Sequence, residues 1–264
     1  MQASYSRGEG EAPLWRRIAD YPLIAMLIAI ALFVGAIPAG LLIASWLPPM
    51  DDLSRLVVQA AINITLVLVV YKLAIVRLGE RPRDDLPAAG AARNLSLGLL
   101  MGLVLIAAVV GVAALLDVYN IVGEGGTEQL LRLLIATAIV PGILEEILFR
   151  GILFRWIEEW AGSWAALLVT AALFGVAHIL NPNATWFSSF AIAVEAGLLL
   201  GGAYMLTRSL WMPIGLHAAW NFAQGFVFDV PVSGLDNQGL VEASLSGPVL
   251  LSGGAFGLEA SLIA

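Results

Sequence analysis

The stretch PGILEEILFRGILF, residues 141–154, carries three ionisable side chains in an otherwise apolar run. Glu145 and Glu146 are adjacent, and Arg150 lies four residues after Glu146. Residues four apart share one helix face, and Glu before Arg is the favourable order, so we expect a Glu146–Arg150 ion pair. Glu145 lies about 100° further round the helix and stays unpaired, which suits a general base. A purely structural network of all three groups is the alternative.

The two histidines of the chain both fall in apolar helical runs. His178 ends AALFGVAH, four residues after Phe174, and we expect the phenyl ring to cover the same helix face. His217 and Asn221 are also four apart and present an imidazole and an amide to one side. A single core histidine is usually structural, but two on separate helices favour a shared polar pocket that includes Glu145.

Glu195 lies in AIAVEAGLLLGGAY, a segment rich in glycine. It either joins this pocket or hydrogen-bonds within a packing surface whose small residues allow close helix contact. We favour the structural role.

The composition indicates a membrane protein. Of 264 residues, 60% are hydrophobic and 12% charged, whereas a soluble domain carries roughly a quarter charged residues. The mean hydropathy is +0.90. The absence of cysteine excludes disulfides, thiolate catalysis and cysteine metal sites. A net charge of −7 and the lack of a phosphate-binding motif argue against a nucleic-acid partner.

Long apolar runs predict an all-α fold, a polytopic transmembrane helix bundle. A membrane helix needs about 20 apolar residues, whereas a barrel strand alternates over roughly ten. The seven predicted spans are residues 21–47, 55–76, 95–116, 129–154, 162–180, 187–207 and 210–228. Residues 1–20 form a polar tail, and residues 21–264 are expected to form one domain. The glycine-rich and serine-rich end of the chain is too short for a full span and predicts at most a partial eighth segment.

The positive charges orient these spans. With the N-terminus in the cytoplasm, eleven of the 13 lysines and arginines lie on the inside, which agrees with the positive-inside rule. Residues 229–240 are then outside. Tryptophans near span ends predict interfacial belts, and RWIEEW, residues 155–160, reads as a short interfacial helix. These tryptophans are Trp156, Trp160, Trp164, Trp186 and Trp211.

Three motifs occur in order on separate predicted helices. EEILFR at 145–150 has the form Glu-Glu-x-x-x-Arg, FGVAH at 174–178 has the form Phe-x-x-x-His, and HAAWN at 217–221 has the form His-x-x-x-Asn. Together they resemble the CPBP (Abi) family, which includes type II CAAX prenyl endopeptidases and bacteriocin-processing enzymes. The resemblance covers about residues 129–228, the expected catalytic core. Each motif alone is a weak signal, but three that use both histidines are specific.

The resemblance implies an intramembrane endopeptidase in a bacterial cytoplasmic membrane. By position, Glu145 and His178 would activate the attacking water, while His217 and Asn221 would stabilise the oxyanion. Glu146 and Arg150 would support the helix that carries the motif. The implied partners are the lipid bilayer and a membrane-associated protein or peptide. Whether that substrate is prenylated, a bacteriocin leader or another membrane protein stays open.

Three alternatives remain. A zinc-dependent protease would use Glu145, His178 and His217 as three ligands with one open position. A metal-independent mechanism is favoured, because two histidines are few for zinc and no His-Glu-x-x-His helix occurs. A transporter would use the buried charges as an ion path, but no inverted repeat appears. A catalytically silent scaffold is disfavoured because all three motifs are complete.

Overall fold

The computed structural model describes residues 13–264, so residues 1–12 of the predicted N-terminal tail lie outside the described part. The described residues of the tail form a short helix, α1, and three long helices, α2, α3 and α4, follow it. These are α1 (Leu14–Asp20), α2 (Pro22–Ser45), α3 (Asp52–Leu73) and α4 (Ala91–Leu115), with a 3-10 turn η1 (Ile75–Arg77) after α3. Pro22 starts α2. The first N–H groups of a helix have no acceptor within the helix, so proline costs no hydrogen bond at this position. The Asp51 carboxylate caps α3 by accepting from the backbone N–H of Ser54 at 2.9 Å.

The first motif lies on a continuous helix of 32 residues that alternates between α and π geometry. Its segments are α5 (Leu130–Leu133), η2 (Leu134–Ile139), α6 (Val140–Glu146), η3 (Ile147–Phe154) and α7 (Arg155–Ala161), of which η2 and η3 are π-helical. The apolar pattern did not predict these π segments. Turns of this kind are rare and occur often at functional sites.

The other two motifs lie on the helices that follow. They are α8 (Ser163–Ala177) with its 3-10 turn η4 (His178–Leu180), the helix built from α9 (Trp186–Ile192), π-helical η5 (Ala193–Gly197) and α10 (Leu198–Thr207), and α11 (Trp211–Phe222) with π-helical η6 (Ala223–Val227). The predicted span boundaries differ from the observed helix ends by a few residues, except in α7, which extends well beyond residue 154.

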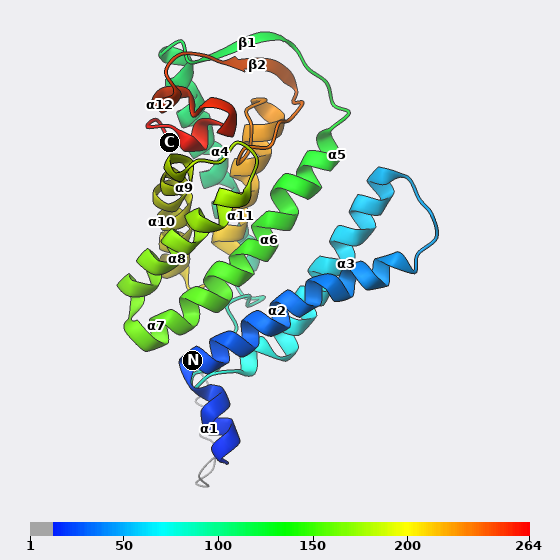
Figure 1. The fold of residues 1–264 in the computed structure, drawn as a ribbon, viewed down its shortest axis with the longest axis vertical. Helices are drawn as coiled ribbons and strands as arrows, with labels where there is room; N and C mark the ends of the chain where they lie inside the picture. Colours follow the sequence, from blue (N-terminus) through cyan, green and yellow to red (C-terminus); the bar gives the residue numbers. More distant parts are fainter. Residues whose placement is uncertain (1–12) are drawn as a thin grey trace.

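The end of the chain folds back on the bundle. It contains β2 (Val241–Leu245), which pairs antiparallel with β1 (Tyr119–Glu124), then α12 (Val249–Ser252), η7 (Gly254–Phe256) and η8 (Leu258–Ala260). The two-stranded sheet corrects the all-α prediction, although the chain is mostly helical (Figure 1). The predicted partial eighth span is instead this strand and these short turns, whose residues Phe256, Leu258 and Ala260 are buried against the helices.

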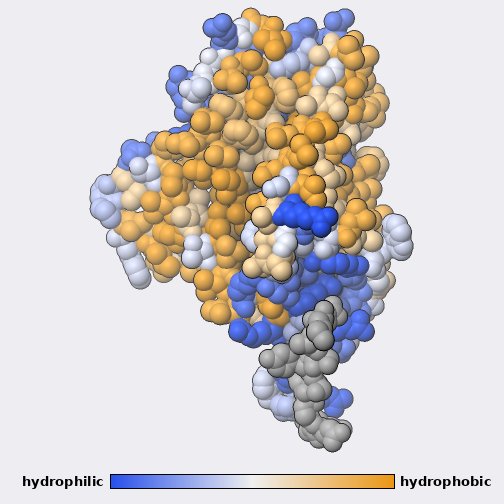
Figure 2. All heavy atoms as spheres, turned by 180° about the vertical axis from the view of Figure 1, so that it is seen from behind, coloured by the Kyte–Doolittle hydropathy of each residue, from blue (hydrophilic) through white to orange (hydrophobic). Residues whose placement is uncertain are grey.

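Five helices of the described residues are long and apolar enough to cross a membrane. They are Pro22–Ser45, Asp52–Arg77, Ala91–Leu115, Ser163–Leu180 and Trp186–Thr207. The predicted count of seven is therefore not confirmed. The two remaining candidates are the charged helix that holds Glu145 and the 17-residue helix Trp211–Val227. Apolar residues cover much of the face in Figure 2, and hydrophilic residues gather near the N-terminus.

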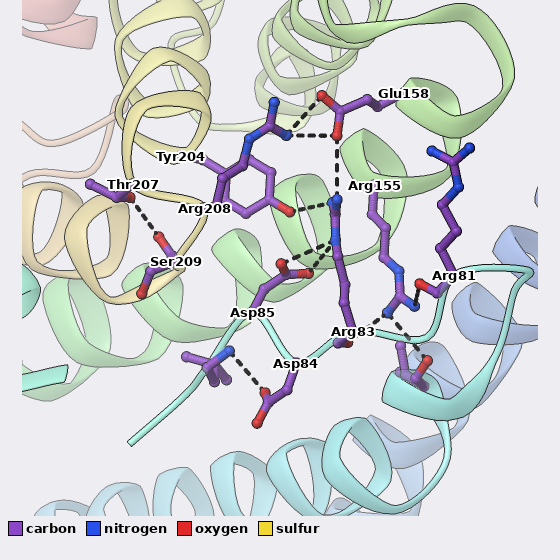
Figure 3. Close-up of polar contacts among 12 residues, drawn as sticks. Arg81, Arg83, Asp84, Asp85, Arg155, Glu158, Tyr204, Thr207, Arg208 and Ser209 are labelled. Carbon is purple, nitrogen blue, oxygen red and sulfur yellow. Dashed lines mark hydrogen bonds and ion pairs between the residues drawn. The ribbon is translucent and has the colours of Figure 1, made fainter. Parts of the chain in front are cut away.

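The two ends of the bundle differ in character (Figure 1). We call the end with α1, α7 and the loop of residues 78–90 the basic end, and the end with the β1–β2 sheet the sheet end. At the basic end the buried Arg155 donates hydrogen bonds to the backbone carbonyls of Leu78 at 3.0 Å and of Arg83 at 3.2 Å (Figure 3). The neighbouring Trp156 is fully buried, which disagrees with its predicted place in an interfacial belt, whereas Trp160 is exposed; residues 155–161 form the short helix α7, which extends the motif helix.

A second set of contacts at the basic end connects the loop to two helices. Arg83 forms an ion pair with Asp85 at 3.1 Å and donates to the Tyr204 hydroxyl at 2.6 Å. Glu158 of α7 accepts from Arg208 at 2.7 Å and lies 3.4 Å from Arg83 (Figure 3). These contacts hold the basic ends of the motif helix and of α10 together.

Close packing of α4 against α11 sets the position of the third motif. A Cβ atom at Gly98 would overlap the backbone oxygen of Met212, and one at Gly215 would lie 2.5 Å from the backbone oxygen of Leu95. Only glycine permits this approach, which is typical of helices packed in membranes. The contact places His217 in the interior of the bundle, where it is buried.

Candidate active site

A buried ion-pair network joins the first motif to the third. The Oε1 atom of Glu146 accepts from Nη1 of Arg150 at 2.8 Å and lies 2.9 Å from Nδ1 of His217. Arg150 also donates to the backbone oxygen of Gly197 at 3.1 Å, and its guanidinium lies 4.8 Å from the ring centroid of Phe174. The Glu146–Arg150 pair confirms the spacing argument. The contact with His217 was not predicted.

Glu145 has a different environment from its neighbour. Its side chain is partly buried, and its Oε2 atom is buried without a hydrogen-bond partner among residues 13–264. Its charge lies near enough to act on both Arg150 and His217. The expectation that Glu145 is the unpaired carboxylate therefore agrees with the geometry.

The histidines open into one small cavity. Its volume is about 20 Å³, enough for one water-sized group. The polar side chains in its wall are His178, Glu195, His217, Asn221, Ser233 and Glu259. The ring of Phe174 lies between the imidazoles, with centroids 4.7 Å from His178 and 6.1 Å from His217. Glu145, Glu146 and Arg150 are outside this wall, behind His217.

The two imidazoles are held by different acceptors. Nδ1 of His178 lies 2.7 Å from the backbone oxygen of Phe174. A carbonyl oxygen only accepts, so Nδ1 carries the proton and Nε2 is a free base. Nδ1 of His217 instead faces the carboxylate of Glu146, which stabilises a doubly protonated imidazolium whose Nε2–H donates. One histidine is therefore suited to accept a proton and the other to donate a hydrogen bond.

Asn221 is held by a backbone carbonyl of the motif helix, four residues before a proline. Its Nδ2 atom donates to the backbone oxygen of Thr137 at 2.9 Å. In an α-helix that oxygen would accept from residue 141, but Pro141 has no N–H. This hydrogen bond fixes one amide proton of Asn221 and leaves the other available. The Pro141-Gly142 pair is the sequence signal for this arrangement, which the spacing of the three motifs does not reveal.

Sequence reasoning also missed two groups from the end of the chain. Ser233 and Glu259 form part of the cavity wall at the sheet end. The signal for Glu259 was a carboxylate within an apolar segment. Glu195, for which a structural role was favoured, also lies in the wall, so its position fits the alternative that it joins the pocket.

The ligands of the zinc alternative do not form an assembled site. Within residues 13–264, no group of three or more His, Asp or Glu side chains lies together so as to hold a metal ion. His178 and His217 share the cavity, but Glu145 is not in its wall. We therefore assign no step to a metal.

Comparison with known proteins agrees with a peptidase. Residues 127–223 match the family described as type II CAAX prenyl endopeptidase Rce1-like. A Bacillus subtilis (strain 168) protein named "Putative membrane peptidase YdiL" is 29% identical over 89 residues, which are 34% of each chain. The match thus spans about a third of the length of that relative. No solved structure matches the chain.

Apolar helices surround a buried carboxylate–imidazole site, and together with this match they support a membrane protease in general. The three motifs lie within residues 127–223, the segment that is similar to the Rce1-like family of type II CAAX prenyl endopeptidases.

Proposed function

We propose that the protein is an intramembrane endopeptidase that hydrolyses a peptide bond of a membrane-associated substrate. The observation that carries the proposal is the shared cavity, into which His178 and His217 open with imidazoles of opposite hydrogen-bonding character. Nε2 of His178 takes a proton from water as the oxygen attacks the carbonyl carbon, and Glu145 assists as the unpaired carboxylate. For this role the Glu145 side chain has to turn towards the cavity, because it is not part of the cavity wall in the structure.

The developing oxyanion then needs donors. Nε2–H of His217 and the free amide proton of Asn221 are on the wall of the same cavity and supply two hydrogen bonds. Each such donor in a water-excluded site contributes roughly 3–4 kcal/mol to transition-state stabilisation. As the intermediate collapses, the proton held by His178 passes to the leaving nitrogen. Glu146 and Arg150 hold His217 and do not touch the substrate.

The proposed reaction uses no metal. We also propose that the bundle has seven spans, with the N-terminus in the cytoplasm. In that arrangement the motif helix and the helix Trp211–Val227 cross the membrane together with the five helices that are long and apolar enough to span it. The positive-inside distribution supports this orientation in a bacterial cytoplasmic membrane.

Peptide-end proteomics of membranes tests the function without a known substrate. Membranes with the wild type should contain new protein ends that are absent from the Glu145→Gln and His178→Ala variants. The exposed Glu242 provides a matched control, and Glu242→Gln should give the wild-type pattern. The same protein ends in all four samples would refute the protease and favour a transporter or scaffold. The identified substrates would also show whether prenylated proteins are among them.

A further inference from the structure

Two carboxylates in the cavity wall, the partly buried Glu195 and the buried Glu259, are not used by the proposed reaction. Glu195 of η5 and Glu259 of η8 line the cavity together with His178 and His217. The Oε2 atom of Glu195 is buried and has no hydrogen-bond partner in the described part of the chain. Glu259 is 4% exposed, and its charge acts on Glu195. The two groups therefore form a pair in which one oxygen lacks a donor.

The fold holds Glu259 in this position. Its Oε2 atom accepts from the backbone N–H of Ser233 at 2.7 Å and from the Ser233 hydroxyl at 3.1 Å. Ser233 has φ +48°, in the left-handed region that is costly for a residue with a Cβ. Gly234 follows with φ +83°, and its N–H donates to the backbone oxygen of Phe256 at 2.9 Å. Strained backbone of this kind is found often at functional sites.

The pair has no countercharge of its own. Neither carboxylate forms an ion pair with a lysine or arginine among residues 13–264. The charge of His217 acts on Glu259 from a distance, but its ion pair is with Glu146. Two nearby carboxylates in a low-dielectric site do not both ionise without a cation. Burial raises the pKa of Glu259 to about 7, although hydrogen bonds from Ser233 oppose the shift. A proton therefore neutralises one of the two carboxylates, and a bound cation would take the place of that proton.

The shape of the site selects the cation. The cavity of about 20 Å³ holds only one water-sized group, the attacking water of the proposed reaction, so the ammonium would lie where Glu195 borders both this cavity and a larger groove. A compact ammonium suits this narrow junction better than a planar guanidinium. The larger apolar groove of about 620 Å³ lies next to the cavity and shares Glu195, Leu199 and Trp220. An alkyl chain can lie along this groove while its charged end reaches Glu195, as long lysine side chains do at apolar surfaces.

We propose that Glu195 and Glu259 form a subsite that binds a primary ammonium group of the substrate next to the scissile peptide bond. This inference rests on the proposed endopeptidase function and names a substrate feature. A primary ammonium has three N–H donors, one of which satisfies the unpartnered Oε2 of Glu195. Its source is either a lysine side chain or the α-ammonium of the released fragment.

A positional library of quenched-fluorescent peptides tests the lysine source. Each peptide carries Lys, Arg or norleucine at one position and is given to the wild type in proteoliposomes. At one position Lys should exceed norleucine in kcat/KM by at least about tenfold, as expected for a charge-assisted hydrogen bond in a dry site. Glu195→Gln and Glu259→Gln should bring that ratio close to one while they still cleave the norleucine peptide, which also shows that they fold. Glu242→Gln should keep the ratio.

Cleavage products test the second source. Product peptides with a free amino terminus are compared as inhibitors with the same peptides after N-acetylation. Stronger inhibition by the free amine, lost in both Gln variants, would assign the subsite to the α-ammonium. The subsite is refuted if the wild type shows no preference in either assay, or if both Gln variants keep the preference. If Glu145→Gln is inactive in these cases, only the subsite fails. The endopeptidase itself fails if the wild type cleaves no peptide, or if Glu145→Gln and His178→Ala both cleave as the wild type does.

Discussion

The Oε1 atom of Glu146 lies 2.9 Å from Nδ1 of His217, although 71 residues separate them in the sequence. The same oxygen accepts from Arg150 at 2.8 Å, so one carboxylate serves a guanidinium and an imidazole. This contact distinguishes the two adjacent glutamates: each has one buried oxygen without a partner in the described residues, but only Glu146 forms ion pairs there. The second glutamate fixes the histidine, and the first remains available for chemistry.

Exchange of the two glutamates for glutamine should separate these roles. Glu146→Gln leaves Arg150 in a buried site without its countercharge, and loss of one partner of such a pair typically costs about 3–5 kcal/mol. We expect less folded protein and a lower melting temperature. Glu145→Gln should abolish cleavage at normal expression and melting temperature. Normal turnover in Glu145→Gln, with loss of activity in Glu146→Gln alone, would reverse the assignment.

The local parts of the site were predictable, and the long-range parts were not. The Glu146–Arg150 pair and the proximity of Phe174 to His178 follow from helical spacing, because the two residues of each pair are four positions apart in the sequence. The Glu146–His217 contact depends on how two helices pack, which periodicity does not determine. Glu259 reaches the cavity through the fold of an irregular segment, where no repeating pattern predicts burial. The apolar pattern also did not distinguish the π-helical segments from α-helix.

Asn221→Ala should slow catalysis without weakening substrate binding. The residue is positioned by the Thr137 carbonyl and presents its second amide proton to the cavity. Loss of one oxyanion donor typically lowers kcat by about 10²–10³. We expect KM to stay near the wild-type value, since the oxyanion forms only in the transition state. Asn120→Ala, at an exposed position in β1, is the matched control. A rise in KM at constant kcat would place Asn221 in substrate binding instead.

The ion pair between Glu158 and Arg208 should be lost in acid. Burial tends to raise the pKa of Glu158, but hydrogen bonds from Arg208 and Ser163 outweigh it and hold the pKa below 4.5. A lowered carboxyl pKa stabilises the folded state above the unfolded pKa, and this contribution disappears as the pH falls through the folded pKa. Because Arg208 is about half exposed, Arg208→Ala should cost about 0.5–1 kcal/mol at pH 7.

Thermal unfolding in detergent as a function of pH checks this prediction. The difference between the wild type and Arg208→Ala should shrink below pH 4.5, whereas the exposed Arg132→Ala control should show little difference at any pH. A difference that stays constant down to about pH 3 would mean that Arg208 acts through packing.

Labelling of a single cysteine tests the orientation. The chain has no native cysteine, and Asp236 is exposed in the turn before β2. With an inside N-terminus and seven spans, an Asp236→Cys variant should react in intact cells with a membrane-impermeant maleimide. An Arg81→Cys variant, in the loop at the basic end, should react only after the membrane is opened. The reverse pattern would invert the bundle.

Chelation separates the glutamate mechanism from its zinc alternative. Protein that works through Glu145 and His178 alone should cleave at the wild-type rate after exhaustive treatment with a chelator. Elemental analysis should then find well below one metal ion per chain. A zinc enzyme behaves differently, because neutral imidazoles hold the ion, and the loss of either histidine releases it. Zinc bound at one ion per chain, lost in both His178→Ala and His217→Ala, would show that a metal is held. Recovery of the activity of chelated wild type on addition of zinc would then replace the glutamate mechanism, and Glu145 would have to move towards the cavity to complete three ligands.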